Sequence, residues 1–386
     1  MRLSSKELIS INSLFRIPTI AFHRFNYAFT LLYHHCKSIV CSRYVRYGMP
    51  LVRVCYGSGT GCQVFFRSLM YICAMRVIHE LSSETEFNEP IVTLGTYDGV
   101  HLGHQQIIRT MVAAAKSQGR ESVLLTFHPH PRMVLYPDSH TVRLIDTVDE
   151  KLKKLEELGL DTVILYPFTS KFSRLTAVEF VRDVLVGQIG VKHMLVGHDH
   201  HFGKNREGNF QQLADMGAIY DFTVEEIRAF QLDGTTISST KIRKSLSEGD
   251  MRTVEQFLGA PYQLSGTVIH GNKLGRTIGF PTANIEMDQA TKMLPAIGVY
   301  AVRIALNGRI LNGVMNIGKK PTVQQTEKIS VEVFIFDFSE DIYGETLTVS
   351  FYDRLRGEQQ FSSIDALKEQ LGKDEQQART ILTALP

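Results

Sequence analysis

The chain has 386 residues, of which 44% are hydrophobic, so it can bury two ordinary cores, and no stretch approaches the eighteen or more uninterrupted apolar residues of a membrane span. Its formal charge of +2 hides an asymmetry, because residues 1–74 carry nine Lys or Arg and one acid, Glu7, whereas residues 75–386 carry 33 basic and 39 acidic side chains. A mildly acidic body argues against extended nucleic-acid binding.

Residues 1–74 form a basic leader that also holds every cysteine of the chain. These are Cys36, Cys41, Cys55, Cys62 and Cys73. Their spacing matches no paired metal-ligand motif, and the remaining chain has no thiol, so we expect a reducing, cytoplasmic environment. The leader is Arg-rich like a transit peptide but lacks a clear apolar segment and cleavage site. It is therefore either a targeting segment or, as we favour, an extension upstream of a working protein that begins at Met75.

Residues 75–258 are expected to form an α/β domain, because short apolar runs alternate with helical periods. The strand-like runs are MRVIHEL (75–81), IVTLG (91–95), SVLLTF (122–127), TVILYPF (162–168) and HMLVG (193–197). Helical patterns cover about 103–117, 150–158 and 178–186. Parallel sheets bind ligands beyond the carboxyl ends of their strands.

The stretch GTYDGVHLGHQQII (95–108) lies at such a strand end. Gly95 lets a phosphate approach the backbone, and the helix that follows offers free N–H groups. His101 and His104 are three residues apart at the helix start, close enough to contact one polyphosphate. The alternatives are two histidines that cap a loop, or a metal pair that lacks a third ligand.

A second polar cluster occurs in TISSTKIRKSL (236–246). Ser238, Ser239 and Thr240 precede a predicted helix, whose first turn contains Lys241 and Arg243. Ordinary N-capping accounts for the hydroxyls. Cations at a helix N-terminus oppose the helix dipole, however, and a bound triphosphate would explain them.

Gly95 with His101-x-x-His104, followed by ISSTKIR, resembles the HxGH nucleotidyltransferases. With TFHPHP (126–131), VGHDHHFGKNREG (196–208) and LGAPY (258–262), the chain from Met75 onward resembles the bacterial bifunctional riboflavin kinase/FMN adenylyltransferases. The resemblance implies a Rossmann-like nucleotidyltransferase domain that transfers AMP from ATP to FMN. It implies that His101 and His104 contact phosphate and that Ser239, Thr240 and Arg243 form a second phosphate clamp. It also implies that Pro129 and Pro131 shape the flavin side of the pocket. The other pocket residues that the resemblance implies are Gly95, Asp98, Asp199, Phe202, Gly203 and Arg206.

The chain departs from the family pattern at several pocket positions. Thr96 and Tyr97 replace the usual Asn-Phe pair, and His128 replaces a residue that is often Glu. Three further histidines (His198, His200 and His201) surround Asp199. A metal site built from these three histidines is an alternative, but it lacks a supporting pattern of cysteines or acids.

After the Gly259-Ala260-Pro261 step, which we take as the domain boundary, the pattern becomes strand-like with tight turns, as in a small antiparallel barrel. Two helical patterns, 364–371 and 375–382, close the chain. The predicted organisation is a leader (1–74), an adenylyltransferase domain (75–258) and a barrel domain with C-terminal helices (259–386).

HGNKLGRTIGFPTANIE (270–286) is the candidate phosphate loop of the barrel. Hydroxyl and amide oxygens such as those of Thr282 and Asn284 suit Mg²⁺, although a Gly-rich hairpin with a polar strand is equally compatible with the pattern. GFPTAN resembles the riboflavin kinase signature, and this resemblance favours the phosphate loop over the hairpin. The loop residues that the resemblance assigns to ATP or flavin are Gly271, Lys273, Gly275, Arg276, Gly279 and Pro281.

Glu332 interrupts the apolar run SVEVFIFDF (330–338). By alternation a lone acid there is exposed, and the resemblance makes it the base that accepts the proton of the ribityl 5′-hydroxyl. Phe334 and Lys320 depart from the usual His and Arg. Arg354 and Arg356 either touch the flavin phosphate or, as we favour, are solvated.

The sequence therefore predicts an enzyme that phosphorylates riboflavin to FMN and then adenylylates FMN to FAD, with ATP as co-substrate and Mg²⁺ as cofactor. We expect a monomer or weak homo-oligomer without nucleic-acid or membrane partners. One alternative is an adenylyltransferase with an inactive barrel. The presence of Thr282, Asn284 and Glu332 argues against this alternative. The other is a flavin-binding regulator without catalysis.

Overall fold

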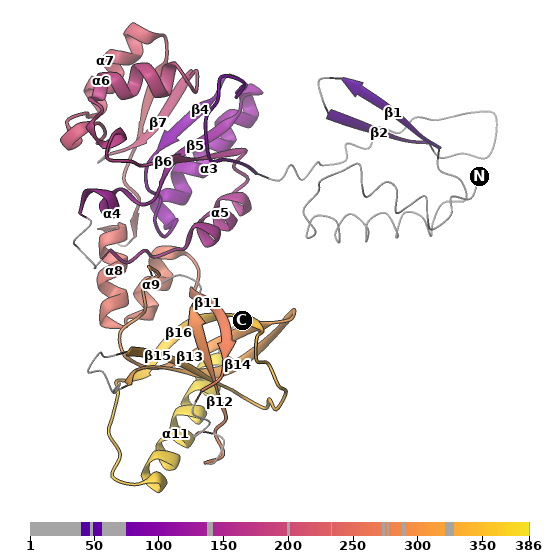
Figure 1. The fold of residues 1–386 in the computed structure, drawn as a ribbon, viewed down its shortest axis with the longest axis vertical. Coiled ribbons are helices and arrows are strands. Elements are labelled where there is room, and N and C mark those ends of the chain that lie inside the picture. The colour runs from indigo at the N-terminus through magenta and orange to yellow at the C-terminus, as the bar shows by residue number, and fades with distance from the viewer. Residues whose placement is uncertain are drawn as a thin grey trace. The chain divides into compact units, whose positions relative to one another are not determined.

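Figure 1 shows the chain as a computed structural model, which describes residues 40–46, 49–55 and 75–385, except 137–141, 199–200, 233, 272–274, 276–277, 288–290 and 321–327. The chain forms two compact units, Met1–Ile72 and Cys73–Pro386. In the first unit, β1 (Val40–Arg46) and β2 (Met49–Cys55) pair as an antiparallel hairpin. The rest of the leader, and the side chains of its cysteines, lie outside the described residues.

The second unit begins with a six-stranded sheet in the order β3-β6-β5-β4-β7-β8, whose neighbouring strands all pair in parallel. The strands are β3 (Arg76–Ile78), β4 (Ile91–Leu94), β5 (Ser122–His128), β6 (Thr162–Pro167), β7 (His193–Gly197) and β8 (Thr223–Ile227). The sequence predicted the first five. It missed β8, because TVEEI lies at the sheet edge and only Ile227 of it is buried.

Helices cover both faces of the sheet. α3 (Leu102–Gln118) and α5 (Val148–Glu157) pack on one face, and the helical segment of α6 (Ala177–Glu179) and η2 (Phe180–Val186) packs with α7 (Phe210–Tyr220) on the other. Successive strand residues point to opposite faces, so Leu124 joins the core under α3 and α5, whereas Val123 and Leu125 join the core under η2. This is the predicted α/β architecture.

Two helices lead from the sheet to the barrel. They are α8 (Ser239–Glu248) and α9 (Met251–Leu258), and a short hairpin of β9 (Gln231–Leu232) and β10 (Thr235–Thr236) precedes them. α9 ends at Gly259, whose left-handed backbone stops the helix, and the first barrel strand starts three residues later at Tyr262. One buried hydrophobic cluster runs from α8 and α9 into the barrel interior.

The second half is a closed barrel in the order β11-β12-β15-β14-β13-β16. Its strands are β11 (Tyr262–Ile269), β12 (Thr282–Met287), β13 (Gly298–Leu306), β14 (Arg309–Lys320), β15 (Lys328–Ile335) and β16 (Thr346–Arg356), and every printed pair is antiparallel. The Asn307-Gly308 dipeptide forms the predicted turn, with positive φ at both residues. Closure pairs every strand on both edges, as the barrel prediction requires.

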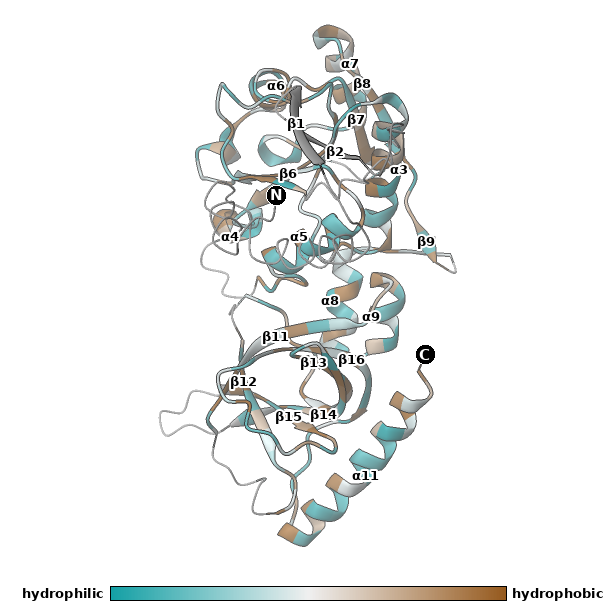
Figure 2. Cartoon of the chain, turned by 90° about the vertical axis from the view of Figure 1, so that its right-hand side faces the viewer, coloured by the Kyte–Doolittle hydropathy of each residue, from teal (hydrophilic) through white to brown (hydrophobic). Residues whose placement is uncertain are grey.

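The two predicted C-terminal helices are one helix, α11 (Ile364–Thr383), which is a correction. No proline interrupts the segment between the two patterns, and Asp374 within it is buried in an ion pair with Arg356, which holds the middle of the helix against the barrel. Ala378 and Leu382 pack into a small apolar cluster with β13 and β14. Figure 2 shows the helix as largely hydrophilic with apolar residues at intervals. Over the part of the chain described here, no helix is both long and apolar enough to cross a membrane.

Candidate active sites

His101 and His104 lie at the start of α3, beyond the carboxyl end of β4. His101 is the N-cap, and its Nδ1 accepts a hydrogen bond from the His104 backbone N–H at 3.3 Å. The two imidazoles stack with centroids 3.6 Å apart, and the Tyr97 ring lies 4.5 Å from that of His104. His101 therefore caps the helix, as the alternative reading allowed for both histidines, and this bond fixes its ring orientation.

Both imidazoles are neutral at physiological pH. Burial is the main cause that lowers the pKa of His101 to about 4. Burial, the repulsion between the two imidazoles when both are protonated and the charge of Lys151 lower the pKa of His104 well below its usual value. Because His101 accepts a bond at Nδ1, its proton sits on Nε2. Nδ1 of His104 is buried and finds no hydrogen-bond partner within the described structure, which leaves a polar atom for a ligand.

The loop between β4 and α3 is tightly wound. Tyr97, Gly99 and Val100 all have positive φ, which is unfavourable for a β-branched valine. A Cβ on Gly95 would meet the Tyr97 ring at 3.0 Å. The positive φ values at three of the four residues 97–100 show that this turn carries backbone strain.

Asp98, which is buried, and Arg243, which is partly buried, form an ion pair that joins this loop to α8. Ser238 is the N-cap of α8, which begins at Ser239, two residues earlier than the sequence analysis predicted. Ser239 and Thr240 therefore lie in its first turn and Arg243 in its second. The Ser239 hydroxyl donates to the Asp98 carbonyl oxygen at 2.9 Å, whereas Thr240 is exposed. The acid partner of Arg243 thus lies within the protein itself.

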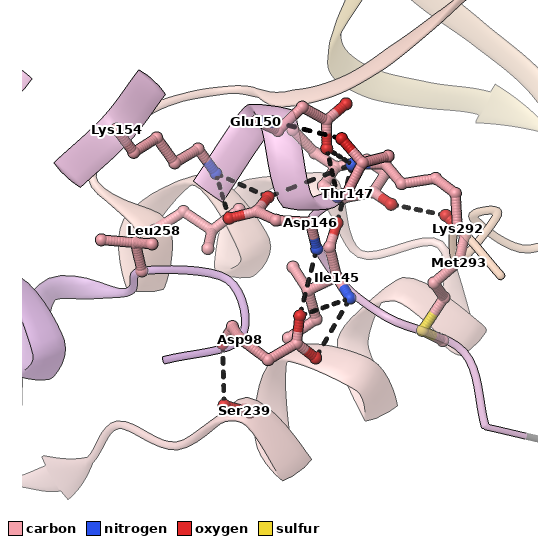
Figure 3. Close-up of polar contacts among 12 residues, drawn as sticks. Asp98, Ile145, Asp146, Thr147, Glu150, Lys154, Ser239, Leu258, Lys292 and Met293 are labelled. Carbon is pink, nitrogen blue, oxygen red and sulfur yellow. Dashed lines mark hydrogen bonds and ion pairs between the residues drawn. The ribbon is translucent and has the colours of Figure 1, made fainter. Parts of the chain in front are cut away.

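Asp98 also holds the segment before α5. Its carboxylate accepts from the backbone N–H groups of Ile145 at 3.0 Å and Asp146 at 3.2 Å (Figure 3). Burial raises the pKa of Asp98, and the Arg243 charge and these two backbone bonds oppose that shift. Asp98 is 5% exposed. All the contacts of its carboxylate that the structure describes are therefore internal.

Residues of the barrel domain support the same segment. Leu144 forms a parallel bridge with Lys292, through bonds of 2.8 Å from Leu144 N to Thr291 O and from Met293 N to Leu144 O. The Lys292 ammonium is buried and bonds to Glu150 and, at 2.7 Å, to the Ile145 carbonyl oxygen. Figure 3 shows this chain of contacts from Lys292 through Ile145 to Asp98.

Lys151 is a second buried lysine beside the histidines. Its Nζ donates to Thr126 Oγ1 at 3.2 Å and to the Thr96 carbonyl oxygen at 3.4 Å. His130 is the N-cap of the short helix α4 (Pro131–Leu135). Burial, together with the nearby charges of Arg243 and Lys151, lowers the pKa of His130 to about 4. Sequence reasoning missed both residues, although the predicted helix at 150–158 contained Lys151.

The flavin-side residues occupy the turn after β5. The His128-Pro129 peptide bond is cis, Pro129 is exposed, and Pro131 opens α4. A group of aromatic side chains lies next to this turn. In this group the Phe172 ring centroid lies 5.5 Å from that of Phe127 and 5.8 Å from that of Phe180. The sequence analysis did not single out this group, because its members are far apart in the chain.

The glycine-rich segment after β7 is only partly described. Phe202 is buried against Phe180, and Gly203 has φ +73, where a Cβ would strike the Ala177 backbone. Arg206 is exposed in the short helical turn η3 (Lys204–Arg206). Asp199 and His200 lie outside the described residues. His198 bonds to Glu226 at 3.1 Å, and the described part of the chain holds no group of three His, Cys, Asp or Glu side chains suited to a metal ion.

The second candidate site lies on the outer face of the barrel. Val331, Val333 and Ile335 point into the core, so Glu332 between them points outward. Glu332 pairs in register with Asn284 of β12, and its Oε2 accepts from the Thr282 hydroxyl at 3.2 Å. The structure thus brings together Thr282, Asn284 and Glu332.

Glycines allow the loop before β12 to approach these side chains. A Cβ on Gly271 would collide with the Asn284 amide, and one on Gly275 would collide with the Phe280 carbonyl oxygen. Gly279 has φ +87, and Pro281 follows just before the strand. Lys273 and Arg276 lie outside the described residues.

Arg354 and Arg356 are not solvated, contrary to the reading we favoured. Arg354 donates to the carbonyl oxygens of Ile297 at 2.6 Å and Glu248 at 3.2 Å. Arg356 forms a bidentate pair with the buried Asp374, at 2.8 to 3.0 Å. Both guanidiniums bind partners distant in sequence, which a local pattern does not reveal.

Two family models match the chain, each over one of the two structural halves. The FAD synthetase model matches residues 83–241, and the riboflavin kinase model matches residues 258–382.

Several relatives share most of their length with this chain. A bifunctional riboflavin kinase/FMN adenylyltransferase of Haemophilus influenzae is 41% identical over 294 residues, which cover 76% of this chain and 94% of that protein. Proteins of the same name from Listeria monocytogenes and Escherichia coli K12 are each 38% identical, over 78% and 79% of this chain and 95% and 96% of their own. A Streptococcus pneumoniae crystal structure, described as a macrolide-efflux protein, has 33% identity and a TM-score of 0.71, covering 79% of this chain and 99% of that one.

Proposed function

The chain belongs to the family of bifunctional riboflavin kinase/FMN adenylyltransferases, and from that premise we propose which residues perform each half-reaction. The enzyme phosphorylates riboflavin to FMN with ATP, then transfers AMP from a second ATP to FMN, giving FAD and pyrophosphate. The observation that carries our assignment is the presence of two separate polar clusters in one chain. One lies at the ends of the parallel strands, and the other on the outer face of the barrel.

We assign adenylylation to the strand-end cluster. His101 and His104 contact the ATP phosphates, the first through Nε2–H and the second through Nδ1, which has no hydrogen-bond partner within the described residues. Ser239, Thr240 and Arg243 form the second clamp, and Asp98 acts by holding Arg243 and the loop rather than by touching the nucleotide. Because no covalent intermediate is needed, these groups act by positioning ATP and FMN and by stabilising charge on the α-phosphate and the departing pyrophosphate.

The remaining pocket residues are proposed to enclose the nucleotide and the flavin. Gly95 lets a phosphate reach the backbone, Phe202 and Gly203 support the wall after β7, and Pro129 and Pro131 shape the flavin side beside the aromatic group around Phe172. Asp199 and Arg206 complete this set on the resemblance to the family. An aromatic surface beside a strand end suits the ring system of a flavin.

We assign the kinase step to the barrel cluster, with Glu332 as general base. Glu332 accepts the proton of the ribityl 5′-hydroxyl while that oxygen attacks the γ-phosphate. The loop residues Gly271, Lys273, Gly275, Arg276, Gly279 and Pro281 cover the ATP phosphates.

Thr282 and Asn284 are the proposed ligands of Mg²⁺ in this site. They occupy alternate positions on one face of β12, and Glu332 stands opposite Asn284, so their hard oxygen donors suit this ion. When bound, Mg²⁺ would neutralise polyphosphate charge.

We further propose that the domains divide at Gly259–Pro261, and that the protein works in the cytoplasm as a monomer or weak homo-oligomer, without nucleic acid. The left-handed turn at Gly259 supports the boundary. The absence of cysteine from residues 75–386 supports the cytoplasmic location, and the acidic body supports the absence of nucleic acid.

One assay tests these proposals together. Riboflavin, ATP and Mg²⁺ are incubated with the full chain and with a chain that begins at Met75, and the flavins are separated by chromatography. We expect FMN and FAD from both. FAD from supplied FMN but no FMN from riboflavin would indicate an inactive barrel, and binding without either product would indicate a flavin-binding regulator. Activity of the full chain alone would contradict a dispensable leader.

A further inference from the structure

Lys151 is a buried cation whose described contacts are all with uncharged groups. It lies in the first turns of α5, which a capping box of Thr147 and Glu150 begins, and it is 8% exposed. Its two hydrogen-bond acceptors, Thr126 Oγ1 and the Thr96 carbonyl oxygen, carry no charge. An ammonium ion that is removed from water without a counter-charge is unfavourable by several kcal/mol. A functional reason for the charge is therefore worth seeking.

The carboxylates around Lys151 are already paired with other cations. Asp98 pairs with Arg243, Glu150 with Lys292, and Asp146 with Lys154 at 2.7 Å. Figure 3 shows Lys154, Asp146, Glu150 and Lys292 in one group. These three acids and four cations, Lys151 included, leave one excess positive charge. The neutral imidazoles of His101, His104 and His130 do not change this balance.

The excess charge lies next to the proposed phosphate site. Lys151 donates to the loop that carries His101 and to Thr126 near the carboxyl end of β5. Its field lowers the pKa of both His104 and His130. Burial lowers the pKa of Lys151 itself, whereas Asp98 and Asp146 act in the opposite direction. An anion that enters this end of the sheet would supply the missing counter-charge.

We propose that the Lys151 ammonium binds the polyphosphate of ATP in the adenylylation step. A phosphate oxygen of FMN attacks the α-phosphorus and forms the new P–O bond. The bond from the α-phosphorus to the oxygen that bridges to the β-phosphorus breaks, and its electron pair leaves with pyrophosphate. Lys151 stays protonated throughout and stabilises the negative charge on the polyphosphate. This inference rests on adenylylation taking place at this end of the sheet.

The test is Lys151→Met, which keeps the length and apolar stem of the side chain but removes its charge. We expect kcat/KM for ATP in FAD formation from supplied FMN to fall at least tenfold, and inhibition by added pyrophosphate to weaken at least tenfold. KM for FMN and riboflavin phosphorylation should stay within twofold. The thermal midpoint should be unchanged or raised, because a neutral side chain removes an unpaired buried charge. Lys151→Arg should restore part of the pyrophosphate inhibition.

Lys153→Met is the matched control, because Lys153 is exposed on the same helix. It should leave every measurement unchanged. Unaltered pyrophosphate inhibition in Lys151→Met would overturn the proposal, as would a loss expressed in KM for FMN, or a loss of activity that parallels a lower thermal midpoint. His104→Ala separates the two assumptions. If it impairs FAD formation and Lys151→Met does not, the site stands and the role of Lys151 fails. If neither variant impairs it, the location of the site fails.

Discussion

The strand-end site and the barrel site differ in how deeply they place their polar and charged groups. At the strand ends Asp98, His101 and Lys151 are 5%, 6% and 8% exposed. On the barrel Thr282 is exposed, and Glu332 is only partly buried on the outer face. In the first site a change of charge therefore alters stability together with chemistry. In the second a charge can be removed while the core underneath stays intact.

The sharpest test of this contrast is Glu332→Gln. The amide keeps the shape of the side chain but cannot accept the proton, so we expect conversion of riboflavin to FMN to fall about 10²- to 10⁴-fold. FAD formation from supplied FMN and the thermal midpoint should be unchanged, because the residue lies outside the barrel core. Separate assays with riboflavin and with FMN measure the two steps. Full kinase activity in a folded variant would leave Glu332 as an ordinary strand residue.

Arg243→Ala should show the opposite behaviour, with stability and activity falling together. It leaves the Asp98 carboxylate buried without its cation, and we expect the free energy of unfolding to fall by about 3–5 kcal/mol. ATP use in adenylylation should weaken more than FMN use, since the guanidinium also serves the phosphate clamp. Urea unfolding and FAD assays at varied ATP measure both effects.

The matched double variant Asp98→Asn/Arg243→Ala isolates the ion pair. It should recover part of the lost stability, because it removes the unpaired charge. The ATP defect should remain. No difference in stability between the single and double variants would show that the ion pair is not the cause of the loss.

His104→Ala should affect chemistry with less effect on folding than Arg243→Ala, because no buried charge loses its partner. We expect FAD formation to fall at least tenfold, equivalent to about 1.4 kcal/mol of transition-state stabilisation. Riboflavin phosphorylation should barely change. Equal losses in both activities would show that this imidazole supports the fold and not the adenylylation step.

The last effect that we expect is a gradual pH dependence of stability from the strand-end histidines. The pKa values of His101 and His130 are about 4 in the folded chain, below the value near 6.5 of an unfolded chain. Between these values the unfolded chain binds more protons, so the free energy of unfolding falls as pH drops from 6.5 to 4, by at most about 1.4 kcal/mol per pH unit for each histidine.

The variant His101→Asn checks this slope. Asparagine is a good N-cap, so it should keep the start of α3 while it removes one titrating group. Urea unfolding at several pH values between 4 and 7 should give a shallower slope for the variant than for the natural chain. Identical slopes would exclude His101 as a source of the acid sensitivity.

Local patterns in the sequence predicted the elements and motifs that depend on neighbouring residues. The spacing of His101 and His104 placed both at one helix start, and the alternation around Glu332 placed it outside the barrel core. The polar edge strand β8 escaped notice, because it carries little apolar periodicity. The single C-terminal helix was misread for a similar reason, since its buried Asp374 interrupts the apolar pattern.

Contacts between distant residues were beyond the reach of such patterns. Asp98 pairs with Arg243 and Lys292 with Glu150 across 145 and 142 positions. The partner of each charge is set by the arrangement of the sheet, α8 and the barrel, and not by local composition. For the same reason the helical pattern at 150–158 did not reveal that Lys151 points to Thr126 and the histidine loop.

The bridge between Leu144 and Lys292 limits how far this protein can be treated as two interchangeable modules. A fragment that ends at Leu258 would retain every side chain assigned to adenylylation, yet it would lose the backbone partners of Leu144 and the cation that neutralises Glu150. Asp98 would then bind a segment that is anchored on one side only. If the gene were split at the domain boundary, or one domain were exchanged for that of a relative, the adenylyltransferase half would keep its catalytic residues. It would still need a substitute for the contacts that residues 291–293 provide.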